Sequence, residues 1–286
     1  MIRMLFFDLD GTLLMPDHRT ISPRTQEALR AARQAGVMLA VATGRCQAIL
    51  PQAIQSLPFD YLITSNGADV TQVGTGRRIL RRHIAPEDAQ LAWEILDPYG
   101  MFLEWFIDRR IAVDEKVNSL IGQLSLPDWH RDYFSKKAYP VFKSVEDYIQ
   151  RGAPGLEKLN LLRCDPVKRA EAWEKLERTG RFTLATSLGT NMEVNAQGCS
   201  KGSSIEALLQ SLHILQEEAA AFGDGGNDVE MLKAVGTGVA MGNALDRVKE
   251  QADAITLSNG EEGVAEWIER TLFVREPVSK AGCLMG

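Results

Sequence analysis

The sequence predicts an α/β fold, a doubly wound parallel sheet with a second, α+β unit inserted into it. Short apolar runs alternate with helical segments at residues 2–64 and again at 201–272, which is typical of strand–helix–strand units. Parallel strands joined in this way form right-handed crossovers and carry helices on both faces of the sheet. Between about residues 84 and 195 the pattern changes to strands that follow one another directly. A length of 286 residues is compatible with about two domains.

The first part of the chain supplies alternating strands and helices. Ser22 can cap a helix whose first position is Pro23, where the missing N–H of proline is not needed. Gly36 ends this helix, and a second apolar run follows. The expected elements are a strand at 2–7, a helix at 23–34, a strand at 37–42, a helix at 46–57 and a strand at 61–64. The polar residues that follow each strand should therefore lie along one edge of the sheet.

The central part of the chain predicts an α+β insert. Two apolar runs lie on either side of Asp108-Arg109, which suggests a β-hairpin. The other expected elements are helices at 86–97, 114–124, 144–151 and 166–178, a strand at 156–163 and two more strands before residue 195. We expect a discontinuous core domain at 1–83 and 196–273, an inserted cap domain at 84–195 and a loose C-terminal tail at 274–286.

The last part of the chain returns to the alternating pattern. Ser200 or Ser203 can cap a helix, which places Lys201 at a helix N-terminus. The helix dipole disfavours a cation there, so a functional use of its charge would explain the lysine. The remaining expected elements are strands at 219–222, 238–241 and 254–257 and helices at 229–234, 244–251 and 263–272.

A basic run before the insert and two aromatic residues within it can be explained without a role in function. The basic run Arg77–His83 is expected to be a solvated face, and attraction of anions toward a cleft is the alternative. Trp105 and Phe106 fit the core of the insert better than a substrate platform.

Composition excludes several classes of protein. A net charge of −6 argues against nucleic acid or an anionic membrane as a partner. No stretch approaches 18 uninterrupted apolar residues, and the N-terminus carries no signal-peptide pattern. The four cysteines lack paired or metal-type spacing, so reduced thiols in a cytoplasmic protein are expected. The sequence indicates no oligomeric state.

Two carboxylates follow the first strand directly. If the backbone stays extended past Phe7, Asp8 and Asp10 project from the same face, and Gly11 then permits a sharp turn. Two like charges at the end of an apolar strand are costly without a positive partner. A divalent cation is the first candidate, since Mg²⁺ prefers one or two carboxylates plus phosphate oxygens. A turn with solvated aspartates is the alternative.

The motifs together resemble those of the haloacid dehalogenase-like phosphohydrolases. The resemblance covers about residues 2–273, and Ser-Asn-Gly-Ala at 65–68 is similar to the Cof-type branch in particular. The four motifs are Asp-x-Asp-Gly-Thr at 8–12, Thr43 in Val-Ala-Thr-Gly-Arg, Lys201 in Cys-Ser-Lys-Gly, and Asp224 with Asp228 in Gly-Asp-Gly-Gly-Asn-Asp. This resemblance implies a Rossmann-like core with a large cap inserted after the third strand.

The resemblance also implies the catalytic roles. Asp8 would be the nucleophile that accepts the phosphoryl group, and Asp10 would be the general acid and base. Thr43 would hydrogen-bond a phosphoryl oxygen, and Lys201 would neutralise charge on Asp8 and the phosphate. The residues implied at the substrate are Thr43, Gly44, Arg45, Lys201 and Asn227.

The same resemblance implies a Mg²⁺ site. The residues implied are Asp8, Asp224, Asp10 through its backbone carbonyl, and Asp228, which would orient the other ligands or Lys201. The metal would neutralise charge and position the phosphoryl group.

The function expected from the sequence is therefore a Mg²⁺-dependent phosphatase acting through an aspartyl-phosphate. Its substrates would be small phosphomonoesters such as sugar phosphates or nucleotide-like metabolites. A phosphomutase with the same residues is one alternative, and a catalytically silent sugar-phosphate-binding regulator is another. Loss of Asp10 or Lys201 would have favoured the regulator, and the sequence retains both. The cap should set the substrate, which its sequence does not identify.

Overall fold

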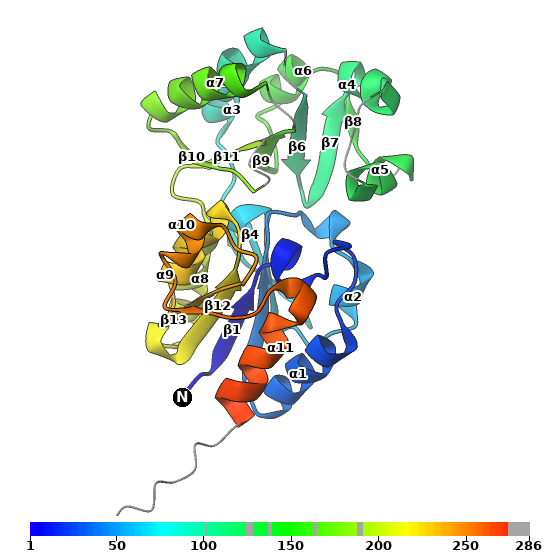
Figure 1. Cartoon of the computed structure of the whole chain (residues 1–286). Coiled ribbons are helices and arrows are strands. Elements are labelled where there is room, and N and C mark those ends of the chain that lie inside the picture. Colours follow the sequence, from blue (N-terminus) through cyan, green and yellow to red (C-terminus); the bar gives the residue numbers. More distant parts are fainter. Residues whose placement is uncertain (101, 124–127, 137–138, 163–164, 188–190, 274–286) are drawn as a thin grey trace, which may run out of the picture.

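Two β-sheets form the body of the protein in the computed structural model (Figure 1). The structure describes residues 1–286 apart from 101, 124–127, 137–138, 163–164, 188–190 and 274–286. The first described sheet has eight strands in the order β14-β13-β12-β1-β2-β3-β4-β5, and the second has six in the order β10-β11-β9-β6-β7-β8. The predicted fold class, a doubly wound parallel core with an inserted α+β cap, is confirmed.

The core sheet is parallel over its first six strands. These are β14 (Ala254–Ile255), β13 (Thr237–Ala240), β12 (Ala219–Gly223), β1 (Met4–Phe7), β2 (Met38–Ala42) and β3 (Tyr61–Thr64). Strand β1 lies between β2 and β12, and all four of its residues are buried. Its C-terminal end therefore opens at the middle of the sheet edge, where doubly wound folds bind ligands.

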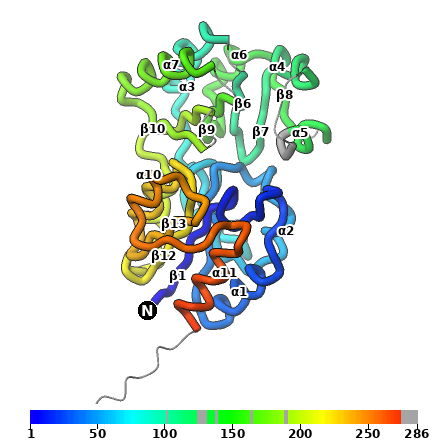
Figure 2. Tube along the Cα trace, in the orientation of Figure 1, coloured from blue at the N-terminus to red at the C-terminus, as the bar shows by residue number. Residues whose placement is uncertain are grey.

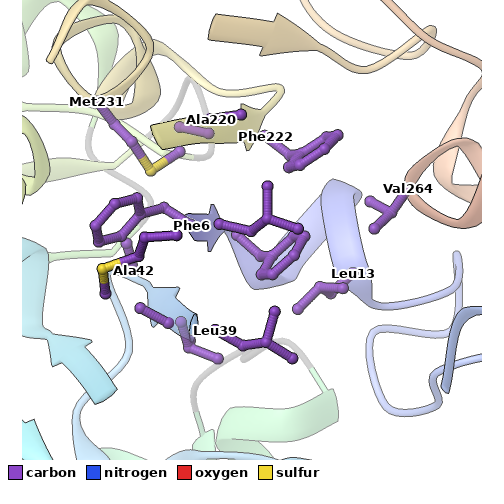
Figure 3. Packing of buried hydrophobic residues seen from close by; sticks show 14 of the residues in the cluster. Phe6, Leu13, Leu39, Ala42, Ala220, Phe222, Met231 and Val264 are labelled. Atoms are coloured by element: carbon purple, nitrogen blue, oxygen red, sulfur yellow. The ribbon is translucent and has the colours of Figure 1, made fainter. Parts of the chain in front are cut away.

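Helices cover both faces of the core sheet. They are α1 (Pro23–Gln34), α2 (Gln52–Gln55), α8 (Lys201–Ser211), α9 (Val229–Lys233), α10 (Asp246–Lys249) and α11 (Gly263–Ile268). Figure 3 shows Met231 of α9 and Val264 of α11 on opposite sides of the packed strand residues. The Phe222 ring stacks on Phe7 at 5.2 Å between centroids and meets the edge of Trp267 at 5.0 Å. This packing fixes the strand ends that carry the site.

The helix predicted at 46–57 is wrong. The structure has a short 3₁₀ turn, η2 (Gln47–Ile49), and then α2. Pro51 separates them, because proline lacks the N–H that a helix interior needs and disfavours helical geometry in the residue before it. Leu50 accordingly has extended backbone angles. By contrast, the predicted cap of α1 is confirmed, since the Ser22 side chain accepts a hydrogen bond from the backbone N–H of Thr25.

Two core strands were not predicted. Strands β4 (Asp69–Gln72) and β5 (Arg78–Arg81) extend the sheet antiparallel from β3. The basic run, expected to be a solvated face, is thus largely an edge strand whose residues are partly or fully exposed. Arg78 pairs with Asp69 at 2.8 Å, and Arg82 donates to the Ser203 hydroxyl. Charged residues on an edge strand also discourage pairing with another sheet.

The second sheet and its helices form the inserted part. Its strands are β6 (Leu103–Ile107), β7 (Arg110–Asp114), β8 (Val141–Phe142), β9 (Leu156–Leu161), β10 (Phe182–Ala185) and β11 (Met192–Ala196). Its helices are α3 (Pro86–Leu96), α4 (Glu115–Leu120), α5 (Asp128–Ser135), α6 (Val145–Gln150) and α7 (Pro166–Arg178). In Figure 1, α3 and α7 lie on the side of this sheet away from the core.

The two faces of the second sheet differ in polarity. Trp105, Leu159 and Val194 belong to the apolar cluster that includes α3 and α7. Side chains alternate along a strand, so the neighbours of these residues point to the other face, toward the core sheet. Those neighbours include Lys158 and Glu193, which are buried although charged. A buried polar face that points toward the core sheet indicates a functional surface.

Figure 2 shows the chain entering the second unit after β5 and returning before α8. The backbone N–H of Arg82 still bonds Ala68 O in the core sheet, whereas that of Ile84 bonds Leu156 O at 2.8 Å in the second sheet. The domain limits at 83/84 and 195/196 stay a prediction that these hydrogen bonds support. The predicted tail at 274–286 lies outside the described residues. No helix in the described ranges is long and apolar enough to cross a bilayer.

Candidate active site

Asp8 and Asp224 meet at the ends of β1 and β12. The turn after Asp8 passes through Gly11, whose φ of +80° favours glycine. A Cβ at Gly11 would lie 2.3 Å from Asp224 Oδ2, so a side chain there would collide with the carboxylate. The Thr12 hydroxyl donates to Asp224 Oδ1 at 2.8 Å. The Asp-Gly-Thr sequence thus brings Asp224 against the loop that follows Asp8.

Lys201 lies between two buried carboxylates. Its Nζ is 2.7 Å from Asp8 Oδ1 and 2.6 Å from Asp228 Oδ1, and all three side chains are less than a tenth exposed. Burial opposes the charged form of Lys201, but Asp228 and Asp8 raise its pKa well above the ordinary value. Ser200 caps the helix, because its side chain accepts from the Ser203 N–H. The cation at this helix N-terminus is therefore held by two anions.

Asp228 supports its neighbours through both carboxylate oxygens. While Oδ1 accepts from Lys201, Oδ2 accepts from the backbone N–H groups of Asp224 at 2.9 Å and Gly225 at 2.8 Å. These bonds hold the Gly-Asp-Gly-Gly-Asn-Asp loop in a tight turn. Asp228 is thus placed to orient both Lys201 and Asp224.

Three carboxylates converge closely enough to hold a metal ion. Ligand atoms of Asp8, Asp224 and Asp228 all lie within 4.8 Å of one another. Burial, and then repulsion from Asp228, raise the pKa of Asp8 above its ordinary value and that of Asp224 to about 7. The repulsion among these carboxylates would be relieved by a bound cation. Hard oxygen donors of this kind fit a cation such as Mg²⁺.

Asp10 is held by a different set of partners. Arg45 donates to both of its oxygens, from Nε at 2.8 Å and from Nη2 at 2.6 Å. Nδ1 of His18 lies 3.1 Å from Asp10 Oδ1. Burial alone would raise the pKa of Asp10, but the hydrogen bonds from His18 and Arg45 lower it to about 2. The Asp10 carboxylate is therefore ionised, and its negative charge is compensated by these partners.

Thr43, Gly44 and Asn227 line the same region. Thr43 follows β2 and accepts the backbone N–H of Arg45 at 3.1 Å through its hydroxyl. The side-chain amide of Asn227 donates to Asn66 Oδ1 at 3.3 Å. Asn66, in the Ser-Asn-Gly-Ala segment, is buried with a φ of 57°. The sequence-predicted site residues therefore lie together at one sheet edge, and their roles stay predictions.

A cavity of about 690 Å³ lies above this edge. Its roof is formed by the second sheet, and its floor by the loop at 16–19 and most of the predicted site residues. Those at the floor are Asp8, Asp10, Thr43, Gly44, Arg45, Asp224 and Asn227. The roof residues are Phe106, Lys158, Asn160, Leu162, Ser187, Asn191 and Glu193. The volume is typical of a small-molecule site.

Sequence reasoning missed the roof residues. The signal was present in Lys-Leu-Asn-Leu at 158–161, where polar side chains alternate with leucines in a strand flanked by other strands. Alternation of this kind predicts one apolar and one polar face, and the polar face belongs to the site. The expectation for Phe106 is corrected in part, because its ring lines the cavity, whereas Trp105 lies in the apolar cluster as expected.

A doubly wound core with an acidic centre at its strand ends, roofed by an inserted sheet, defines the class of capped α/β hydrolytic enzymes. The chain belongs to the haloacid dehalogenase-like hydrolases, whose family model matches residues 5–268. Its relatives are named phosphatases, so the predicted membership of this superfamily and its enzyme class are confirmed.

Two relatives from Bacillus subtilis strain 168 match most of the chain. The phosphatase YwpJ is 31% identical over 95% of this chain and 100% of its own length. The 5-amino-6-(5-phospho-D-ribitylamino)uracil phosphatase YcsE is 30% identical over 93% of this chain and 94% of its own length. The HMP-PP phosphatase of Cronobacter sakazakii is 29% identical over 87% of each chain.

Solved structures of the same family superpose over the whole fold. A haloacid dehalogenase-like hydrolase from B. subtilis has a TM-score of 0.84 at 27% identity, covering 94% of this chain and 100% of that one. A subclass IIB sugar phosphatase has a TM-score of 0.78 at 26% identity, covering 95% and 100%.

Proposed function

We propose that the protein is a Mg²⁺-dependent phosphatase that hydrolyses small phosphomonoesters through an aspartyl-phosphate on Asp8. The observation that carries this is the 2.7 Å contact between the buried Lys201 Nζ and Oδ1 of Asp8, which lines the cavity floor. A buried cation on the nucleophile lets an anionic phosphoryl group approach an anionic carboxylate. Asp10 lies at the same floor, where it can reach the leaving oxygen.

Asp8 and Asp224, with the backbone carbonyl of Asp10, would hold the metal, and Asp228 would orient them. Bound Mg²⁺ supplies charge neutralisation and a fixed position for the phosphoryl oxygens. It would also favour the ionised form of Asp8, which burial disfavours here. The nucleophile is then available at neutral pH.

The first step is attack of an Asp8 carboxylate oxygen on phosphorus. A new O–P bond forms on Asp8, the bond from phosphorus to the leaving oxygen breaks, and that oxygen takes a proton from Asp10. Lys201 and the Thr43 hydroxyl contact the transferring group. Asp10 can carry this proton only after Arg45 leaves it, since Arg45 keeps it ionised. We assign Arg45 to the substrate once the substrate is bound.

The second step regenerates the enzyme. Asp10, now ionised, takes a proton from water, and the water oxygen attacks phosphorus while the Asp8–phosphorus bond breaks. Inorganic phosphate leaves, and Asp8 returns as a carboxylate. The low pKa of Asp10 beside Arg45 and His18 suits the ionised form that accepts this proton, and Asp10 then carries the proton for the next first step.

The names of the relatives indicate the size and chemical class of the substrate. Their names describe action on a ribitylaminouracil phosphate, on HMP-PP and on sugar phosphates, all small phosphorylated metabolites. We assign the same broad class to this cavity of about 690 Å³.

The test is release of inorganic phosphate from acetyl phosphate and from a panel of metabolite esters. Mg²⁺ should support turnover, excess chelator should abolish it, and Asp8→Asn should reduce it to background. The matched control is Asp97→Asn, which makes the same change at an exposed site after α3 and should keep wild-type activity. Turnover of Asp8→Asn within tenfold of wild type contradicts the proposal. An isomeric phosphate ester as product, without free phosphate, would instead identify a mutase.

A further inference from the structure

The roof of the cavity comes from one face of three paired strands. Phe106 on β6 lies opposite Lys158 on β9, and Asn160 on β9 lies opposite Glu193 on β11. Paired residues point to the same face of a sheet, so these four side chains form one surface above the catalytic floor. A leaving group attached to a phosphate at Asp8 must meet this surface.

The charges on the described part of this roof compensate one another. Lys158 Nζ lies 2.7 Å from Glu193 Oε1, and both side chains are less than a twentieth exposed. Lys158 also donates to the Gly44 carbonyl at 2.7 Å, and Glu193 Oε2 accepts from the Asn66 amide at 3.0 Å. The one cation and one anion among the described roof residues are thus both engaged. A charged leaving group would lose hydration there without gaining a counter-charge.

The charged side chains of the loop that closes the cavity on the core side already have partners as well. Arg19 pairs with Asp132 of α5 at 2.7 Å. Asp17 accepts hydrogen bonds from the hydroxyl and the backbone N–H of Thr20. His18 lies against Asp10.

One wall of the cavity is apolar. Ile49, Phe106 and Leu162 line it and belong to a single buried cluster. Nζ of Lys158 lies 4.4 Å from the Phe106 ring centroid and so covers one face of that ring. The wall offers van der Waals contact and no hydrogen bonds, which favours a leaving group with an apolar face over one that is hydroxylated on all sides.

Uncharged polar groups complete the roof. Asn160 donates to Glu104 Oε2 at 2.9 Å and accepts from Asn191 Nδ2 at 3.2 Å. Asn191 in turn accepts from the Thr186 hydroxyl at 3.0 Å and from the Ser187 N–H at 3.1 Å. These bonds hold the carboxamides in place. A primary amide has two donor hydrogens and an acceptor oxygen, so it matches the ring nitrogens and the oxo or amino groups of a heterocycle.

We infer that the leaving group of the natural substrate is an uncharged heteroaromatic alcohol, a nucleoside or a hydroxymethyl heterocycle, bound between the apolar wall and the carboxamides. This rests on the proposed phosphatase function and specifies its substrate. The phosphoryl group lies at Asp8 and Lys201, the ring contacts Phe106 and Leu162, and its polar edge faces Asn160. A cavity of about 690 Å³ accommodates such an ester.

The experiment compares kcat/KM for matched phosphate esters with Mg²⁺. Uridine 5′-monophosphate against ribose 5-phosphate isolates the heterocycle, and 3-pyridylmethyl phosphate presents a heterocycle without a sugar. Glucose 6-phosphate against 6-phosphogluconate and glucosamine 6-phosphate isolates the effect of charge. At least one heteroaromatic ester should exceed ribose 5-phosphate and glucose 6-phosphate by about tenfold or more, equivalent to about 1.4 kcal/mol. Both charged sugars should fall below glucose 6-phosphate.

A variant then tests the contact itself. Asn160→Asp adds a negative charge of nearly the same shape to the roof. It should lower the ratio of kcat/KM for the best heteroaromatic ester to that for acetyl phosphate by about tenfold. Asn118→Asp, the same change on exposed α4, should leave the ratio unaltered. A ratio within twofold of wild type for Asn160→Asp overturns the assignment of Asn160.

The outcomes separate the two proposals. If acetyl phosphate is hydrolysed but neither heteroaromatic ester exceeds the sugar phosphates, or a charged sugar exceeds glucose 6-phosphate, the substrate inference is wrong and the phosphatase stands. If no ester, acetyl phosphate included, releases phosphate in Mg²⁺, the phosphatase proposal fails and this inference fails with it.

Discussion

Replacing Lys158 with methionine would remove the cation that joins the second sheet to the core. Lys158 Nζ contacts Glu193 Oε1 and the Gly44 carbonyl, each at 2.7 Å, and the side chain is 1% exposed. Methionine keeps the length and apolar volume of the stem, so packing against Phe106 is largely retained. The change therefore isolates the charge.

The expected loss of stability follows from burial and distance. At 2.7 Å the attraction of two unit charges is about 6 kcal/mol at an effective dielectric constant of about 20, and desolvation offsets part of it. Removing one partner of a buried pair leaves the other charge uncompensated, which typically costs about 3–5 kcal/mol. We expect Lys158→Met to lower the free energy of unfolding in urea by this amount.

A double-mutant cycle with Glu193→Gln checks the cause. Glutamine can keep the hydrogen bond from Asn66, so the double variant should recover at least about 2 kcal/mol relative to the sum of the single variants. An interaction energy below about 0.5 kcal/mol, or a Lys158→Met variant as stable as wild type, would refute the reasoning.

The pH dependence gives a second check. Burial raises the pKa of Glu193, but Lys158 and Asn66 outweigh this and hold it below the ordinary 4.5. A lowered acid pKa contributes stability that is present above 4.5 and lost as the pH falls below it. The difference between wild type and Lys158→Met should therefore shrink in acid. A difference that stays constant down to the acid transition would contradict this origin.

Three further outcomes are expected. Asp10→Asn should lower steady-state turnover roughly 10²–10⁴-fold and accumulate acid-stable phosphoenzyme, measured by mass spectrometry; no accumulation above wild type contradicts the acid–base role. Burial and Asp228 raise the pKa of Asp224 from 3.8 to about 7, so the free energy of unfolding of the metal-free protein should fall as the pH rises through that interval. Bound Mg²⁺ should remove this loss of stability. Urea titrations in which stability has the same pH slope in chelator and in Mg²⁺ would contradict this prediction. Ser200→Ala should destabilise the protein by about 1 kcal/mol in the same urea assay through loss of the helix cap, whereas an unchanged midpoint would exclude a stabilising cap.

Much of the core could be predicted because its signals are local. Apolar runs separated by capped helices predicted β1, α1, β2 and β3, and the Ser22 cap has the predicted geometry. The acidic motifs follow different strands of one parallel sheet, so the topology alone brings Asp8 and Asp224 to the same edge. The proximity of these two carboxylates, which are far apart in the sequence, could be predicted because both segments were correctly predicted as strands.

The rest depended on contacts that local patterns do not encode. Strands β4 and β5 are short and polar, and only pairing with β3 makes them part of the sheet. Alternation in β9 predicts two faces but not which one meets the core, and that is decided by long-range contacts such as Asn66 with Glu193. The break at Pro51 was the exception, since proline in a helical segment is a local signal that the prediction underweighted.

The hydrogen bond from Lys158 to the Gly44 carbonyl bears on how this enzyme could be re-engineered. Gly44 is the residue after Thr43, so the roof residue that balances charge also touches the segment that we propose binds the phosphoryl group. A library that randomises Lys158 or Glu193 would disturb specificity and turnover together, and most of its members would be inactive. Asn160 lines the cavity and bonds Glu104 and Asn191 within the second unit, so libraries confined to this position can change substrate preference while the cavity floor stays intact.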